Sequence, residues 1–195
     1  MNLPLIAPIV EGHGEVLAIR ELVTRIGLEL LGGTWIEVGQ PFRLDSGKMR
    51  KPDELAKAIR FQSARVQGRG GVLVVRDGDD SDIECAVQLA GLLKPGPGLF
   101  PVDVQVVIAW KEYEAWFLAA AESLRTHPSV RDDAAVPTNH EGKRDAKHEL
   151  EKLMLESYKE TLHQAKFSAL IDLQTAAANS RSFRRLIHAI EELAG

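Results

Sequence analysis

The hydrophobic residues of the chain form two kinds of pattern, short unbroken apolar runs and apolar positions at helical spacing. Three runs rich in β-branched residues are typical of buried strands, and a weaker one is a further candidate. They span residues 5–10, 71–76, 102–109 and, more weakly, 35–38. Apolar residues that return every three or four positions predict helices between them. These helices cover residues 15–31, 52–67, 81–93 and 112–124.

Strands that alternate with helices predict βαβ units, a mostly parallel sheet and helices on both of its faces. Residues 126–141 are polar and contain two prolines, which is typical of a loop. Beyond the loop the pattern is helical over 142–155, 160–173 and 180–194, without a further strand. We therefore expect an α/β core over residues 1–125 and, over 126–195, a loop and a helical extension packed on that core as one compact unit.

Composition narrows the class of protein. The 195 residues are 45% hydrophobic and 27% charged, which excludes a disordered tail or a fibre. The single cysteine, Cys85, excludes an internal disulfide, and its place in a predicted helix suggests a small buried side chain. No apolar run is long enough for a membrane span, and the first residues lack the basic start of a signal peptide. We expect a cytoplasmic protein without a membrane partner.

Charge is unevenly distributed within a net charge of −4. Residues 44–69 carry seven basic and three acidic side chains, so this segment could follow a phosphate backbone or form an ordinary solvated helix face. The same alternatives apply to the smaller group Arg181, Arg184 and Arg185. The acidic excess lies in residues 1–43 and 70–140, largely in three short clusters.

Each acidic cluster directly follows a predicted strand. The clusters are Glu11 and Glu15 after 5–10, Asp77, Asp79, Asp80 and Asp82 after 71–76, and Glu112 and Glu114 after 102–109. In a parallel sheet these positions share the edge where ligands bind. Carboxylates gathered there repel one another unless a cation lies between them, and oxygen ligands without thiolates suit Mg²⁺ or Mn²⁺. Alternatively, each carboxylate simply stabilises a helix N-terminus.

Two nucleotide-binding motifs do not fit the first cluster. The chain has no phosphate loop of the type G-x-x-x-x-G-K-[ST]. Gly12-His-Gly14 begins like a dinucleotide loop, but Leu17 stands where the third glycine belongs. In addition, Glu11 would place a negative charge against the pyrophosphate.

The first two clusters resemble the Toprim domain, in which Glu-Gly-x-x-Glu follows one strand and Asp-x-Asp follows a later one. Glu11-Gly-His-Gly-Glu15 and Asp77-Gly-Asp79 have these spacings. Further segments resemble a bacterial Toprim-like family catalogued as domain of unknown function 4276, which is related to the overcoming-lysogenization-defect nucleases. These segments are 111–118 (KEYEAWFL), 158–166 (YKETLHQAK), 171–173 and 182–183. The resemblance covers most of the chain and implies a Rossmann-like Toprim core with a C-terminal helical extension.

The resemblance also implies a metal-dependent phosphodiesterase. Asp77 and Asp79 would hold one Mg²⁺ or Mn²⁺, and Glu11 would be a ligand or a general base. Glu15 could hold a second metal with Asp82 or Glu114. Residues two apart on a helix point to different sides, so at most one of Glu112 and Glu114 is expected to be a ligand. We slightly prefer Glu114, which is followed by Ala115 and Trp116.

A basic side chain is usually needed to neutralise the transition-state phosphate. Lys159 and Lys166 are the candidates, although both could be ordinary surface lysines. His13 could act as a base or position a water, or could simply be a turn residue. Trp35, Trp110, Trp116 and Phe117 are expected in the core.

Three functions are compatible with these sequence features. The first is a nuclease of a bacterial anti-phage defence system, with nucleic acid as its substrate. The second is a non-catalytic scaffold or sensor subunit that partners an ATPase. The third is a hydrolase of small phosphate esters using the same site. We favour the nuclease, because a scaffold has no physical need for mutually repelling carboxylates at one sheet edge.

Overall fold

The computed structural model describes residues 3–137, 141–142 and 145–195. Its centre is a five-stranded sheet with the order β2-β1-β4-β5, in which β3 also pairs with β1. All of these pairings are parallel, which confirms the expected α/β class. The strands are β1 (Leu5–Val10), β2 (Glu37–Val38), β3 (Phe42–Arg43), β4 (Gly70–Asp77) and β5 (Asp103–Ala109).

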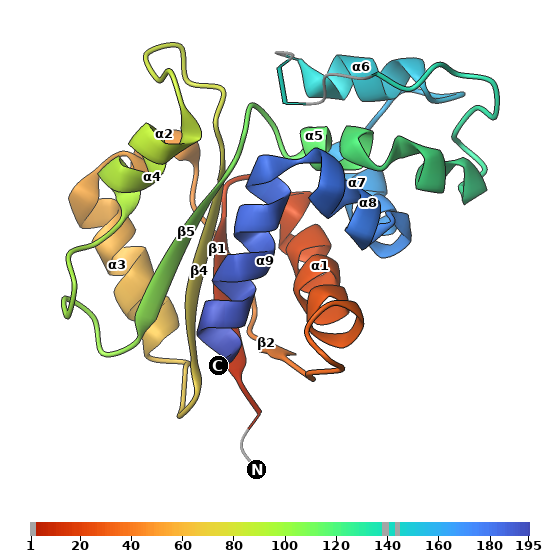
Figure 1. Ribbon diagram of the computed structural model, residues 1–195. Coiled ribbons are helices and arrows are strands. Elements are labelled where there is room, and N and C mark those ends of the chain that lie inside the picture. Colours follow the sequence, from red (N-terminus) through yellow and green to blue (C-terminus); the bar gives the residue numbers. More distant parts are fainter. Residues whose placement is uncertain (1–2, 138–140, 143–144) are drawn as a thin grey trace.

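Helices cover both faces of the sheet, as expected (Figure 1). On one side lie α2 (Ser46–Met49), α3 (Pro52–Ser63) and α4 (Ala86–Leu93). On the other side α1 (Glu15–Glu29) and α9 (Arg181–Ala194) lie side by side. The remaining helices lie beyond the carboxyl ends of the strands and beside α1. They are α5 (Glu114–Ala119), the 3₁₀ helix η1 (Ala121–Thr126), α6 (Ala146–Lys152), α7 (Glu160–Leu170) and α8 (Leu173–Asn179).

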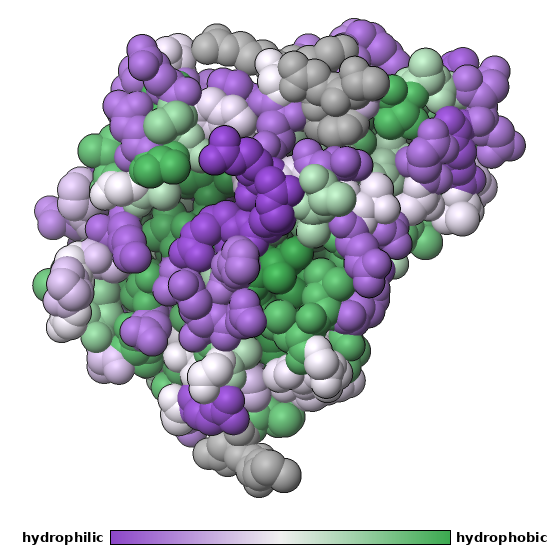
Figure 2. Space-filling view, viewed as in Figure 1, coloured by the Kyte–Doolittle hydropathy of each residue, from purple (hydrophilic) through white to green (hydrophobic). Residues whose placement is uncertain are grey.

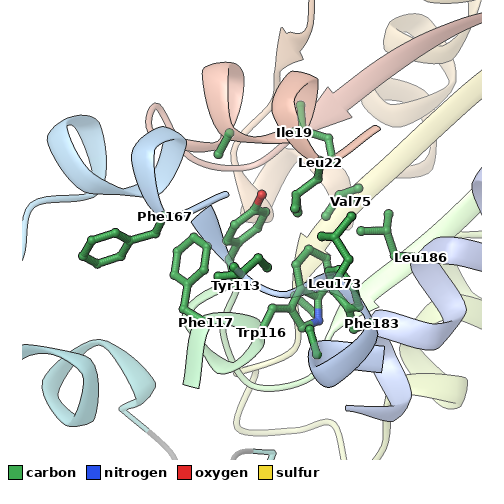
Figure 3. Packing of buried hydrophobic residues seen from close by; sticks show 14 of the residues in the cluster. Ile19, Leu22, Val75, Tyr113, Trp116, Phe117, Phe167, Leu173, Phe183 and Leu186 are labelled. Carbon is green, nitrogen blue, oxygen red and sulfur yellow. The ribbon is translucent and has the colours of Figure 1, made fainter. Parts of the chain in front are cut away.

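The larger of two hydrophobic cores lies between the sheet and the helices on the α1 and α9 side. An aromatic cluster forms its centre (Figure 3). The Trp116 ring lies 4.7 Å from that of Tyr113 and 5.6 Å from that of Phe183, measured between centroids. Phe117 contacts Phe167 at 5.6 Å. All five side chains are fully buried, so helices from the middle and from the C-terminal part of the sequence complete one core.

Several predicted elements are shorter in the structure. The helix expected over 81–93 begins only at Ala86, because ion pairs to arginines hold the preceding acidic turn. The helix expected over 112–124 ends at Ala119 and continues as η1. The helix expected from 160 ends at Leu170, where Asp172 caps the separate helix α8. The two-residue strand β3 and the four-residue helix α2 are too short to give a sequence pattern.

Two expectations about single residues were wrong. Cys85 is exposed at the N-cap of α4, where its Sγ accepts a hydrogen bond from the backbone N of Gln88. Trp35 is 56% exposed and is no core residue. By contrast, Trp116 and Phe117 are buried as predicted.

Strand β5 lies at the end of the sheet order, toward the viewer in Figure 1. A groove of about 620 Å³ runs beside it between α4 and α9, lined by Val106, Ile108 and Trp110 among others. On this face hydrophobic side chains lie on both sides of a central hydrophilic band (Figure 2). None of the described helices combines the length and the apolar character needed to cross a lipid bilayer.

Candidate functional site

The turn between β1 and α1 is closed by Glu15. This side chain is 3% exposed and accepts hydrogen bonds from the backbone N of Glu11 (3.2 Å) and of Gly12 (3.1 Å). Gly14 is needed because α7 comes so close: a Cβ there would lie 2.2 Å from Gln164 Oε1 and 2.7 Å from the backbone of Glu160. The motif therefore fixes the Glu15 carboxylate and a close contact to α7.

The turn after β4 is pressed against the end of β5. Gly78 donates its backbone N–H to the carbonyls of Ala109 (2.9 Å) and Lys111 (3.1 Å). A Cβ on Gly78 would lie within 2.8 Å of both Ile108 and Trp110. The adjacent Asp77 carboxylate accepts a hydrogen bond from the backbone N of Tyr113 at 2.8 Å, just before α5. This contact joins the second acidic cluster to the third.

Glu114 is fully buried at the start of α5. Its Oε1 accepts hydrogen bonds from the Tyr158 hydroxyl (2.7 Å) and from Gln164 Nε2 (2.8 Å). Its Oε2 is buried without a hydrogen-bond partner. Glu112 points elsewhere and accepts a hydrogen bond from the backbone N of Lys147 at 2.9 Å. Of the two glutamates, Glu114 is the one whose charge acts on Asp77 and Glu15.

Glu11, Glu15, Asp77 and Glu114 form one carboxylate cluster, because their charges act on one another. Burial raises the pKa of Glu15 to about 8, and the charges of Glu11 and Glu114 add to the effect. Burial also raises the pKa of Asp77 well above its usual value, with further contributions from the other three carboxylates. Burial raises the pKa of Glu11 and of Glu114 as well. The cluster holds more negative charge than its buried surroundings favour.

Two cations partly offset this charge. Burial alone would lower the pKa of Lys147, but Glu114, Glu160 and Asp77 outweigh it and raise that pKa. Lys147 Nζ lies 2.7 Å from Glu160 Oε1. Arg76, only 1% exposed on β4, pairs with Asp80 at 2.6 Å, and its Nε lies 3.7 Å from Glu11 Oε2.

Other predicted site residues lie at the margin of the cluster or apart from it. Asp79 is exposed, and its charge contributes to the raised pKa of Glu11. The Asp82 side chain is 57% exposed and pairs with Arg50 at 2.6 Å. His13 and Lys159 are exposed as well. Lys166 is also exposed. Burial lowers the pKa of His127, and the positive charge of Lys166 lowers it further.

Sequence reasoning missed four residues that contact or offset the carboxylates. Tyr158 and Gln164 lie in the segment 158–166, where only the lysines stood out as candidates. Arg76 was visible as a single charge at the end of an apolar run. Lys147 had no sequence signal, because it lies 33 positions beyond Glu114 in a segment of balanced charge.

The chemistry of this donor set fits a divalent cation, although its present arrangement does not yet form a complete site. All donors are carboxylate oxygens, which suit Mg²⁺ or Mn²⁺. Glu11 Oε2 and Glu114 Oε2 are buried without hydrogen-bond partners. However, no three His, Cys, Asp or Glu side chains in the described ranges are placed to hold an ion together. The Arg76 pairing with Glu11 and Asp80 accounts for part of this.

Comparison with known proteins identifies the family. Among solved structures, the chain is similar over its whole length to the whole of a chain described as the C-terminal region of the Burkholderia pseudomallei OLD protein, with 14% sequence identity and a TM-score of 0.43. No curated protein is similar enough to count as a match. The profile of the family described as domain of unknown function (DUF4276) matches residues 10–191, which contain the whole carboxylate cluster. The chain therefore belongs to the DUF4276 family.

Proposed function

We propose that the protein is a metal-dependent phosphodiesterase that acts on nucleic acid. The carboxylate cluster carries this proposal. Its four acidic side chains come from the ends of β1 and β4 and the starts of α1 and α5, and their burial keeps the pKa of each above its ordinary value. Grouping buried carboxylates costs folding free energy, and side chains with such strongly raised pKa values are typical of functional sites.

Glu11 and Asp77 would hold Mg²⁺ or Mn²⁺, together with Glu15 or Glu114 and with Asp79 at the exposed margin. The ion would supply positive charge to the phosphate oxygens. Glu11 is also the candidate general base, because its raised pKa lies closer to neutrality than that of an ordinary glutamate. Lys147, whose charge interacts with those of Glu114 and Asp77, would neutralise charge on the substrate, a role for which Lys159 and Lys166 remain candidates.

One observation favours the alternative of a non-catalytic scaffold or sensor that partners an ATPase. Internal groups already contact the carboxylates: Arg76 lies by Glu11, while Tyr158 and Gln164 donate to Glu114. A scaffold could keep such a cluster without a metal. A role in anti-phage defence is part of both proposals and follows from the family resemblance.

The first test is calorimetric titration of the protein with Mn²⁺ and with Mg²⁺. We expect saturable binding that is lost in Asp77→Asn/Glu11→Gln and kept in Glu37→Gln, which changes an exposed carboxylate on β2. Cleavage of labelled DNA and RNA is then measured with the same variants. Absence of binding both alone and with a non-cleavable oligonucleotide, which could complete the metal shell, would favour the scaffold.

A further inference from the structure

Three arginines from separate segments lie around residues 40–43, beside strand β1. Arg20 of α1 donates from Nη1 to Gln40 Oε1 at 3.4 Å. Arg65, just beyond α3, donates from Nη1 to the Gln40 carbonyl at 3.3 Å. Arg43 of β3 donates from Nη1 to the Glu11 carbonyl at 3.5 Å. We call Arg20, Arg43 and Arg65, together with Phe61, the arginine patch.

An exposed aromatic ring lies within this patch. Phe61 is 48% exposed, and the Arg65 guanidinium carbon lies over its ring, 4.5 Å from the centroid. Phe42, next to Arg43, supports Phe61 from another side at a centroid distance of 5.4 Å. A guanidinium held over an aromatic ring is a flat cationic surface on which an unpaired base can stack.

The patch has no carboxylate that neutralises it. In the part of the chain that the structure describes, none of its three arginines forms an ion pair with an acidic side chain. Of the other cations in residues 44–69, Lys48, Arg50 and Lys57 each pair with a carboxylate. In the second basic group, Arg185 pairs with Glu192 at 3.2 Å and donates to Gln105, and Arg184 donates to the carbonyls of Ala177 and Ala178. Arg20, Arg43 and Arg65 are exposed and available to an anion.

The patch is continuous with the carboxylate cluster, because Arg43 contacts the backbone of Glu11. Cations beside a cluster of acids give an incoming polyanion a place to bind where the acids alone would repel it. We propose that the arginine patch binds the backbone phosphates and one unpaired base of single-stranded nucleic acid, and that it leads the strand to Glu11. That the nucleic-acid strand is led to Glu11 rests on the proposed function, whereas binding of the strand to the arginine patch does not.

The test measures binding without metal, so that catalysis plays no part. Fluorescence anisotropy of a labelled single-stranded oligonucleotide is recorded in EDTA at about 50 mM salt, where phosphate contacts are strong. We expect Arg43→Ala/Arg65→Ala to weaken binding about tenfold or more and to reduce the salt dependence by about one phosphate contact for each arginine. Phe61→Leu should weaken binding to single strands and leave binding to a duplex unchanged.

The control is Lys94→Ala/Lys152→Ala, which removes the same charge from exposed positions at the C-terminal ends of α4 and α6 and should bind like the wild type. Circular dichroism and thermal melting exclude misfolding. Three outcomes would overturn the proposal. They are an equal loss of binding in the control variant, equal affinity for duplex and single strand, and no binding by the wild type. Binding that depends on the patch without any cleavage in Mg²⁺ or Mn²⁺ would instead contradict only the phosphodiesterase.

Discussion

Asp77 is the residue at which stability and function should oppose each other most directly. Its carboxylate is buried among three others, which raises its pKa well above the usual value. Asp77→Asn removes one repelling charge and keeps an oxygen that can accept the hydrogen bond from Tyr113. We expect the free energy of unfolding at pH 8 to rise by at least about 1 kcal/mol, while metal binding is lost. Urea unfolding of both proteins without metal measures the change, and a loss of stability would contradict this account.

Glu15 makes stability depend on pH. Its pKa is about 8 in the folded protein against an ordinary 4.5, so the folded state holds a proton that the unfolded state releases. The stability that this proton gives is complete below about pH 4.5 and is lost as the pH rises through about 8. We expect the wild-type free energy of unfolding to fall between pH 5 and 9 without metal.

A matched comparison isolates the contribution of Glu15. Glu15→Gln should show a shallower decline over the same pH range, since the titrating group is gone. Glu37→Gln, at an exposed position, should keep the wild-type slope. A wild-type stability that rises across this range would rule out the raised pKa values.

The residues of the cluster show what sequence can and cannot reveal about a site. Glu11, Glu15 and Asp77 were predictable because parallel strands end at one edge. Helix geometry allowed only one of Glu112 and Glu114, and it did not by itself decide which. Asp82 follows the strand-edge rule as well, yet its side chain pairs with Arg50. That pairing, like the position of Lys147, depends on how distant segments pack, and no local pattern records it.

At the scale of elements, the close approach of α1 and α7 depends on Gly14. Gly14→Ala would force a Cβ against Gln164 and the backbone of Glu160. We expect a loss of about 1–3 kcal/mol in unfolding free energy. The control is Gly91→Ala within α4, because a Cβ at Gly91 would meet no atom within 4 Å. This substitution should raise the free energy of unfolding by about 0.5–1 kcal/mol. Urea unfolding measures both changes in free energy. Similar effects of the two substitutions would contradict a close contact between Gly14 and α7.

The elements themselves were predictable to different degrees. Strands β1, β4 and β5 are buried on both sides, so their unbroken apolar runs are visible in the sequence. Helix boundaries were less clear, because Asp172 and Cys85 cap helices through side-chain contacts that hydrophobic spacing does not report. Short elements such as β3 owe their existence to pairing with β1.

At the scale of the whole molecule, α9 completes the main core. Phe183, Leu186 and Ile190 are fully buried against the sheet and the aromatic cluster. We expect Phe183→Ala to cost about 3–5 kcal/mol and a chain ending at Asn179 to lose cooperative unfolding. His188→Ala, at an exposed position of the same helix, should have little effect. Thermal melting followed by circular dichroism distinguishes these outcomes, and a cooperative transition in the shortened chain would show that α9 is dispensable.

The place of α9 also has a consequence for biosynthesis. During translation β1, β4 and β5 leave the ribosome well before α9, so the part of this sheet face that α1 does not cover stays exposed until residues 181–194 emerge. An apolar surface exposed in this way is prone to associate with other chains. Chaperone contact during synthesis should therefore last until α9 has docked, and slow translation of the final segment would prolong the vulnerable period.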